Sequence, residues 1–141
     1  MPALFSICIV FTACIATSAM AQESAPAQIF DEWSINDVWH QAKLRGVSFR
    51  AVGQEPGWLL EITNGSAILL VLDYGQSSTA YAYVEPEVYP ELRKTRYLTG
   101  DVEVLIEGKD CRDSMSGEEF AVTVTITVKD RRLTGCGRAL H

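Results

Sequence analysis

Two short segments carry the residues whose types and spacing could do chemistry. The first is Gly53-Gln54-Glu55-Pro56-Gly57-Trp58, and the second is Cys111-Arg112-Asp113-Ser114-Met115-Ser116-Gly117. An acid near a flat amphipathic ring can form a contact surface. A constrained loop of Ser, Asp and Gly can present backbone N–H groups or a carboxylate to a ligand. The candidate ligand-binding residues are therefore Glu55, Trp58, Asp113, Met115 and Ser116.

Each segment also has a purely structural interpretation. Trp58 is in phase with Leu60 and Ile62 on one face of an expected strand, which is typical of a core residue. Asp113 and Ser114 belong to the residue types that bond their own backbone in Asx-type turns. The pattern favours the structural interpretation in both segments and leaves binding open.

Catalysis and metal binding have little support in the sequence. The chain has two histidines, His40 and His141, and neither lies in a nucleophile motif. No phosphate-cradling glycine loop or dinucleotide fingerprint occurs, and the residue pattern lacks the clusters that metals require. We therefore expect no enzymatic activity, no metal and no cofactor. One alternative stays open, a hydrolase that uses a carboxylate pair such as Glu55 and Asp113.

The first 21 residues predict an export signal. Residues 3–21 contain no charged residue and end in Ala19-Met20-Ala21, the small-x-small pattern that signal peptidase accepts. Ser and Thr residues dilute this apolar stretch, which favours a cleaved signal over a membrane span. Lipidation of Cys14, or an uncleaved anchor, is the rival interpretation. Residues 22–33 then form a polar linker, and residues 34–141 form a single domain.

Export would leave two cysteines in the mature chain. Cleavage after Ala21 removes Cys8 and Cys14 and leaves Cys111 and Cys136. Two cysteines in an exported chain most simply form one disulfide. Closing the loop between these two cysteines with a disulfide stabilises the folded state by about 3 kcal/mol in the chain-entropy description.

The elements that must position these residues are one helix and a series of strands. Ile35, Val38, Trp39 and Ala42 share one helical stripe, with Ser34 as N-cap and Gly46 as terminator. Apolar alternation and turn residues such as Asn64-Gly65 then predict strands. The expected strands cover residues 47–52, 57–63, 66–73, 79–85, 101–107, 120–128 and 133–136, with 86–96 as a loop.

This pattern indicates a mainly β fold. The chain has 141 residues, of which 48% are hydrophobic and 21% charged, which suits one globular domain. About seven or eight short strands with regular turns predict a small antiparallel meander barrel, because closure removes exposed strand edges. We expect the N-terminal helix to pack on this barrel.

Two stretches resemble an uncharacterised family of small bacterial envelope proteins, described as predicted lipoproteins or membrane proteins. The stretches are Arg45–Ile62 and Cys111–Cys136. They match a Gly-x-Glu-Pro-x-Trp element followed by Cys-x-Asp-x-Met-Ser and a terminal Gly-Cys. The resemblance covers most of the chain after residue 21 and implies a periplasmic location, with no established activity. The chain departs from lipidated members because it lacks a good lipidation site.

The charge balance narrows the class of partner. Twelve Lys and Arg residues against eighteen Asp and Glu residues give a net charge of −6, which disfavours nucleic acid. We expect a non-catalytic envelope protein, without a membrane span after cleavage, that binds a partner protein or a small ligand. A second hypothesis is an inhibitor of a host hydrolase such as lysozyme, because an acidic surface suits a cationic enzyme.

Overall fold

The computed structural model describes residues 37–141, and the expected signal peptide, the linker and the Ser34 cap lie outside this range. Within the range, one short α-helix precedes eleven β-strands. The mainly β fold with a helix, as expected from the sequence, is confirmed. None of the helices in residues 37–141 has the length and apolar character that crossing a membrane requires.

The helix, α2 (Val38–Leu44), begins after a side-chain cap. Asp37 is its N-cap, and the Asp37 carboxylate accepts a hydrogen bond from the Trp39 backbone N–H at 3.0 Å. The helix ends before Gly46, whose φ of 87° is a conformation that glycine adopts without strain. Ala42 of the expected apolar stripe is fully buried, whereas Val38 is exposed.

The strands form one large sheet and one small hairpin. In chain order they are β1 (Phe49–Gly53), β2 (Trp58–Thr63), β3 (Ala67–Leu72), β4 (Ser77–Ala82), β5 (Glu87–Tyr89), β6 (Lys94–Thr99), β7 (Val102–Glu107), β8 (Cys111–Arg112), β9 (Glu119–Phe120), β10 (Val122–Val128) and β11 (Arg131–Ala139). Two 3-10 turns, η1 (Asp73–Gly75) and η2 (Pro90–Leu92), join β3 to β4 and β5 to β6.

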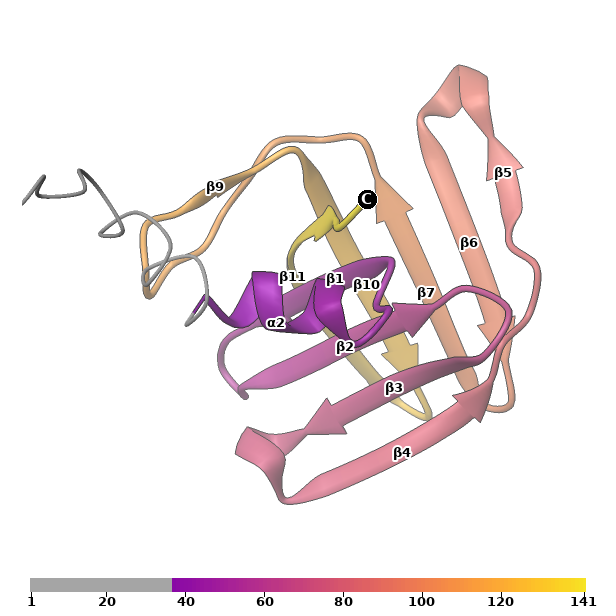
Figure 1. Ribbon diagram of the computed structural model, residues 1–141, viewed down its shortest axis with the longest axis horizontal. Helices are drawn as coiled ribbons and strands as arrows, with labels where there is room; N and C mark the ends of the chain where they lie inside the picture. Colours follow the sequence, from indigo (N-terminus) through magenta and orange to yellow (C-terminus); the bar gives the residue numbers. More distant parts are fainter. Residues whose placement is uncertain (1–36) are drawn as a thin grey trace, which may run out of the picture.

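The large sheet is antiparallel and curls into a half-barrel (Figure 1). Its nine strands run in the order β4-β3-β2-β1-β11-β10-β7-β6-β5, and β8 pairs with β9. Adjacent strands in the sequence are mostly neighbours in the sheet, but β1 lies between β2 and β11. The first and last long strands therefore meet at the centre of the sheet, and β4 and β5 form its two edges.

One segment was predicted wrongly. Residues 86–96 were expected to form a loop, but they contain β5, η2 and the start of β6. Pro86 and Pro90 flank β5 instead of interrupting it, and the Glu87 and Arg96 side chains form an ion pair across the two strands. The apolar alternation that reveals a strand is absent here because the three residues of β5 are all exposed.

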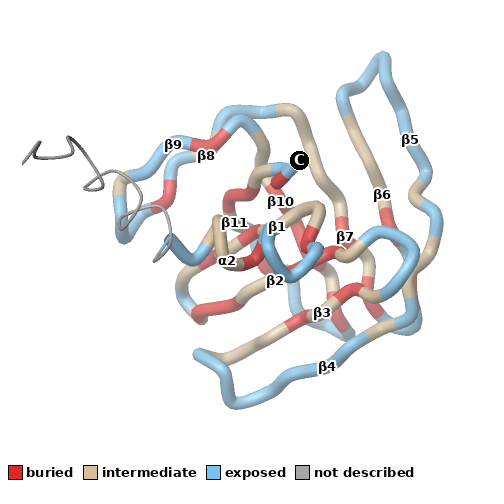
Figure 2. Tube along the Cα trace, in the orientation of Figure 1, coloured by how far each residue is buried: buried red, intermediate tan, exposed pale blue. Residues whose placement is uncertain are grey.

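The core lies between the curled strands (Figure 2). Its fully buried members include Leu60 and Ile62 of β2, Val104 of β7 and Ile126 of β10. A second, smaller cluster joins α2 to the sheet, because Ala42 packs with Val47, Leu140 and Trp39. The helix is thereby anchored beside β1 and the C-terminal end of the chain.

Candidate functional site

The predicted disulfide is present. Cys111 of β8 is bonded to Cys136 of β11, which is 25 residues further along the chain. The bond fastens the β8–β9 hairpin to a central strand of the large sheet. The Asp113 loop, which joins β8 to β9, is therefore held at its base.

Asp113 organises this loop as an Asx-type turn. Its Oδ1 atom accepts hydrogen bonds from the Met115 N–H at 2.9 Å and from the Ser116 N–H at 2.7 Å. The Ser116 hydroxyl donates a third bond to the same atom at 3.0 Å. Asp113 is only 6% exposed, so these donors replace the water that a carboxylate otherwise binds. The structural interpretation of Asp113 holds, with Ser116 supplying the hydroxyl.

The same donors shift the titration of Asp113. The hydrogen bond from the Ser116 backbone is the largest cause and lowers the pKa of Asp113 below its ordinary value. Bonds from the Ser116 hydroxyl, the Met115 backbone and the Gln54 side chain lower the pKa further, while burial opposes them. The carboxylate is therefore held in its ionised form, which suits a structural acceptor better than a general acid.

The Gly53–Trp58 segment separates its two candidate residues. Trp58 is 4% exposed and belongs to the core, whereas Glu55 lies at the surface with a φ of 55°. A Cβ atom on Gly53 would lie 2.1 Å from Trp58 Nε1, and one on Gly135 would lie 2.6 Å from Trp58 Cζ2. The indole thus fills a space that only glycines leave open, and the Glu55 carboxylate does not share a surface with it.

The two motif segments nevertheless meet, through Gln54. Gln54 and Asp113 both line a cavity of about 180 Å³, and the Gln54 side chain is one of the groups that lower the pKa of Asp113. Residues from three regions line it: Gly53 and Gln54, the stretch from Cys111 to Ser114, and the stretch from Thr134 to Cys136. The disulfide, the Asx turn and the β1–β2 connection therefore form one contiguous region of the molecule.

A groove of about 250 Å³ borders this region, and we call it the α2 groove. Its lining residues come from α2, from β1 and its end, and from the segment between β8 and β10; they are Val38, Trp39, Arg50, Val52, Gln54, Asp113, Met115, Ser116, Glu118 and Phe120. Three candidate binding residues, Asp113, Met115 and Ser116, are thus brought together. Met115 is 73% exposed, while Glu55 and Trp58 are not among the lining residues.

Sequence reasoning missed the aromatic residues Trp39 and Phe120 that line this groove and the arginines that contact them. The rings of Trp39 and Phe120 have centroids 5.3 Å apart. The Arg138 guanidinium lies 4.9 Å from the centroid of Trp39 and 4.6 Å from that of Phe120, within cation–π range. Arg50 contacts Trp39 from β1 at 5.4 Å. These residues are up to 99 positions apart in the sequence (39 to 138), so no local motif could have revealed the cluster.

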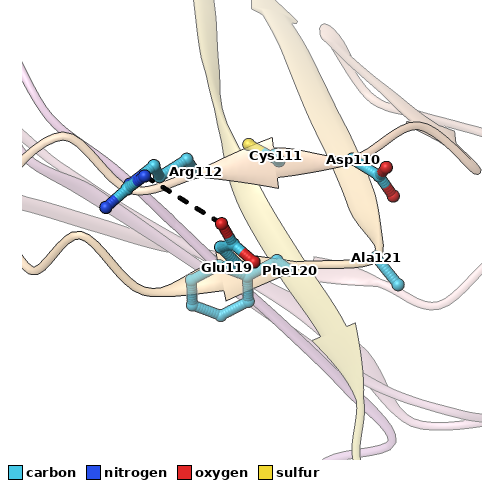
Figure 3. A pocket seen from close by; sticks show the side chains of 6 residues that line it. All are labelled: Asp110, Cys111, Arg112, Glu119, Phe120 and Ala121. Atoms are coloured by element: carbon cyan, nitrogen blue, oxygen red, sulfur yellow. Dashed lines mark ion pairs between the residues drawn. The ribbon is translucent and has the colours of Figure 1, made fainter.

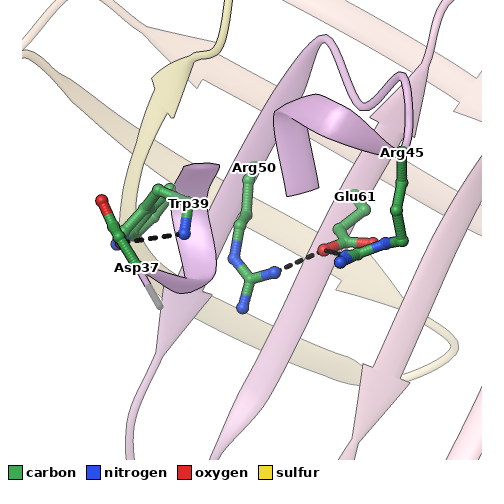
Figure 4. Close-up of polar contacts among 5 residues, drawn as sticks. All are labelled: Asp37, Trp39, Arg45, Arg50 and Glu61. Carbon is green, nitrogen blue, oxygen red and sulfur yellow. Dashed lines mark hydrogen bonds and ion pairs between the residues drawn. The ribbon is translucent and has the colours of Figure 1, made fainter. Parts of the chain in front are cut away.

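Ion pairs to the buried carboxylate of Glu61 fix the position of Arg50 (Figure 4). Glu61 of β2 is buried, and its Oε1 atom accepts hydrogen bonds from both Arg50 and Arg45, the latter at 2.8 Å. The Arg50 Nε atom is buried and has no hydrogen-bond partner among residues 37–141. Arg50 therefore contributes a positively charged side chain to the groove, and its ion pair with Glu61 holds this side chain in place.

A larger cavity of about 490 Å³ lies along the β8–β9 hairpin (Figure 3). Its side chains are those of Asp110, Cys111, Arg112, Glu119, Phe120 and Ala121. Arg112 and Glu119 face each other across the hairpin at 4.0 Å, and both are largely exposed. An exposed pair at this distance contributes little to stability, and the cavity adds no chemistry to that of the α2 groove.

Comparisons of the chain with protein families, with curated proteins and with solved structures give no match. In residues 37–141, no group of three or more His, Cys, Asp or Glu side chains is placed to hold a metal ion.

Proposed function

We propose that the protein is an exported envelope protein that binds a partner protein or a small ligand in the α2 groove, without catalysing a reaction. The observation that carries this proposal is the convergence of Trp39, Gln54 and Met115 from three separate segments of the chain on one concave surface. Apolar grooves with a few fixed polar groups are the usual form of a binding site.

The rigidity of the groove supports binding. The disulfide holds the base of the Asp113 loop, and the three bonds to Asp113 Oδ1 hold its tip. A surface that is already ordered loses less conformational entropy when it binds. Met115, exposed at the end of this ordered loop, supplies a flexible apolar contact that adapts to a partner.

The state of Asp113 favours binding over the carboxylate-pair hydrolase. Its Oδ1 atom already accepts three hydrogen bonds, and its lowered pKa keeps it ionised at neutral pH. A general acid needs a pKa raised toward the working pH. Asp113 therefore suits the role of a positioning residue for the loop.

The proposed location is the bacterial periplasm. It is supported by the uncharged N-terminal stretch that ends in Ala19-Met20-Ala21. It is supported also by the disulfide between Cys111 and Cys136, because such bonds persist in oxidising compartments.

Photo-crosslinking in living cells tests the proposed groove. Met115 is replaced by a photo-crosslinkable phenylalanine derivative in the full-length chain, and illumination should give a discrete adduct in the envelope fraction. The matched control carries the same derivative at Val88, which is 59% exposed but lies on β5, outside the groove. Adducts at Val88 equal to those at Met115, or no adduct at Met115, would contradict binding at the groove.

A further inference from the structure

The two edges of the sheet are protected very differently. β5 has three residues, lies between two prolines, and carries the Glu87–Arg96 ion pair. Short strands, prolines and charges are the devices that prevent an edge from pairing with another chain. β4 has six residues, Ser-Ser-Thr-Ala-Tyr-Ala, with no charge and no proline, and five of the six are exposed (Figure 2). β4 therefore lacks the protection that β5 has.

The register identifies which backbone groups of β4 point away from the sheet. The Tyr83 N–H donates to the Ser66 carbonyl, so the pair formed by these residues is a hydrogen-bonded one. Because hydrogen-bonded pairs alternate in an antiparallel ladder, Ser77, Thr79 and Tyr81 bond to β3, while Ser78, Ala80 and Ala82 point outward.

A side-chain contact agrees with this assignment of inward and outward residues in β4. The Ala82 carbonyl accepts a hydrogen bond from the Thr99 hydroxyl of β6 at 3.0 Å, so it points away from β3. Among residues 37–141, the outward N–H and C=O groups of Ser78 and Ala80 have no hydrogen-bond partner. β4 thus presents a short row of free donors and acceptors.

We propose that β4 pairs with β4 of a second copy of this chain, antiparallel and centred on Thr79. In this register Ser78 lies opposite Ala80 of the second copy, and Ala80 lies opposite Ser78 of the second copy. Both are outward-pointing residues, so each pair exchanges two backbone hydrogen bonds. The interface is a two-fold one, in which the same strand serves both partners.

The second copy suits this edge because the strand is complementary to itself. Centring the pairing on a residue, and not between two residues, makes every outward residue face another outward residue. Thr79 then faces Thr79 of the second copy in a non-hydrogen-bonded pair, where side chains are close enough to bond. The chain carries a net charge of −6, so two copies repel each other over most of their surfaces. Because β4 has no charged residue, two copies can approach along it without placing like charges face to face.

Sedimentation velocity of the purified full-length protein over a concentration series tests the proposal. The native chain should shift from monomer to dimer as its concentration rises. Thr79→Lys sets two ammonium groups face to face at the two-fold axis and should raise the dimer Kd by on the order of tenfold or more. Val88→Lys, at the exposed centre of β5, should leave Kd unchanged.

A charge-swap mixture separates loss of pairing from loss of folding. Thr79→Glu alone should raise the dimer Kd in the same way, but an equimolar mixture with Thr79→Lys should dimerise as readily as the native chain, because the axis then holds opposite charges. Thr79→Cys should give on oxidation a covalent dimer that peptide mapping shows to be linked through residue 79 of both copies, since the two thiols meet at the axis.

Three results would overturn the proposal. The first is a native chain that stays monomeric over the whole series. The second is an equal effect of Thr79→Lys and Val88→Lys on self-association. The third is a charge-swap mixture that fails to recover dimers although both variants retain the circular dichroism of the native chain.

Discussion

At the scale of the residue, the carboxylate of Asp113 organises the loop that joins β8 to β9. One carboxylate oxygen satisfies two backbone N–H groups and one hydroxyl within a single turn. The backbone of the loop is closed as well, because the Gly117 N–H donates to the Asp113 carbonyl at 2.9 Å. Met115 and Ser116 therefore owe their positions in the α2 groove to Asp113.

Removing this acceptor should be costly. Asp113→Ala should lower the free energy of unfolding by about 2–3 kcal/mol, because it removes the charged acceptor of three hydrogen bonds. Asp113→Asn should cost less, since its amide oxygen still accepts hydrogen bonds. Urea unfolding of the three proteins measures both effects. An Asp113→Ala variant as stable as the native chain would contradict the role assigned to this side chain.

The lowered pKa of Asp113 predicts a pH dependence of stability. A carboxyl whose pKa is lower in the folded than in the unfolded state stabilises the protein above its unfolded pKa, near 3.8. This contribution is lost as pH falls through the lower folded pKa. The stability advantage of the native chain over Asp113→Asn should therefore be constant near pH 7 and shrink below about pH 4. Urea unfolding at several pH values measures it, and an advantage that grows on acidification would contradict the assignment.

At the scale of the element, the packing of β1 against β11 depends on glycine. A Cβ atom at Gly135 would lie 2.1 Å from the Val52 carbonyl oxygen and 2.6 Å from the Trp58 ring. The Val52 carbonyl oxygen is a backbone atom, so it cannot rotate away from an added Cβ atom as the end of a side chain could. The absence of a side chain at Gly135 leaves the space that the Trp58 ring occupies.

Gly135→Ala should therefore lower the free energy of unfolding by about 3 kcal/mol or prevent folding. Gly57→Ala is the matched control, because its nearest neighbour is the exposed ring of Tyr74, which is free to rotate away. Thermal unfolding followed by Trp fluorescence compares them. Equal losses in the two variants would show that backbone proximity at Gly135 is not the cause.

The disulfide anchors the β8–β9 hairpin to β11. Replacing Cys111 and Cys136 together by serine should lower the free energy of unfolding by about 3 kcal/mol. It should also weaken the photo-adduct at Met115, because the loop that carries Met115 loses its anchor to β11. If the adduct is unchanged while stability falls, the groove does not depend on the anchored hairpin.

At the scale of the whole molecule, side chains hold the half-barrel curved. The end of β4 is tied to the far side of the sheet by the Thr99–Ala82 bond, and the rings of Tyr83 and Tyr97 meet with centroids 6.3 Å apart. Tyr81 also donates a bond to Asp101 at 3.4 Å. The curl thus brings the end of β4 toward β6 without strand pairing, and it leaves the outward groups of Ser78 and Ala80 free of partners among residues 37–141.

Amide hydrogen exchange should report this arrangement directly. At low protein concentration, the outward amides of Ser78 and Ala80 should exchange fast, and the inward amides of Thr79 and Tyr81 should exchange slowly. At concentrations where dimers form, the outward amides should become protected. NMR measures each amide separately. Uniform protection along β4 at low concentration would show that the assignment of inward and outward amides is wrong.

The sequence predicted those parts of the structure that rest on local patterns. The strands from Trp58 to Thr63 and from Val122 to Val128 follow apolar alternation, and Gly46 ends the helix as expected. The disulfide was also predicted, because only Cys111 and Cys136 remain after the expected signal. The Asx turn followed from the residue types around Asp113.

Tertiary structure alone decided the rest. The pairing of β1 with β11 joins residues about ninety positions apart, such as Phe49 and Ala139, and no short-range pattern specifies it. That pairing places Arg50 opposite Arg138, and both guanidinium groups contact the ring of Trp39, which lines the α2 groove together with Arg50. It also fixes which strands become edges. Local pattern sets what a segment can form, whereas the burial of distant faces against each other determines where each segment lies.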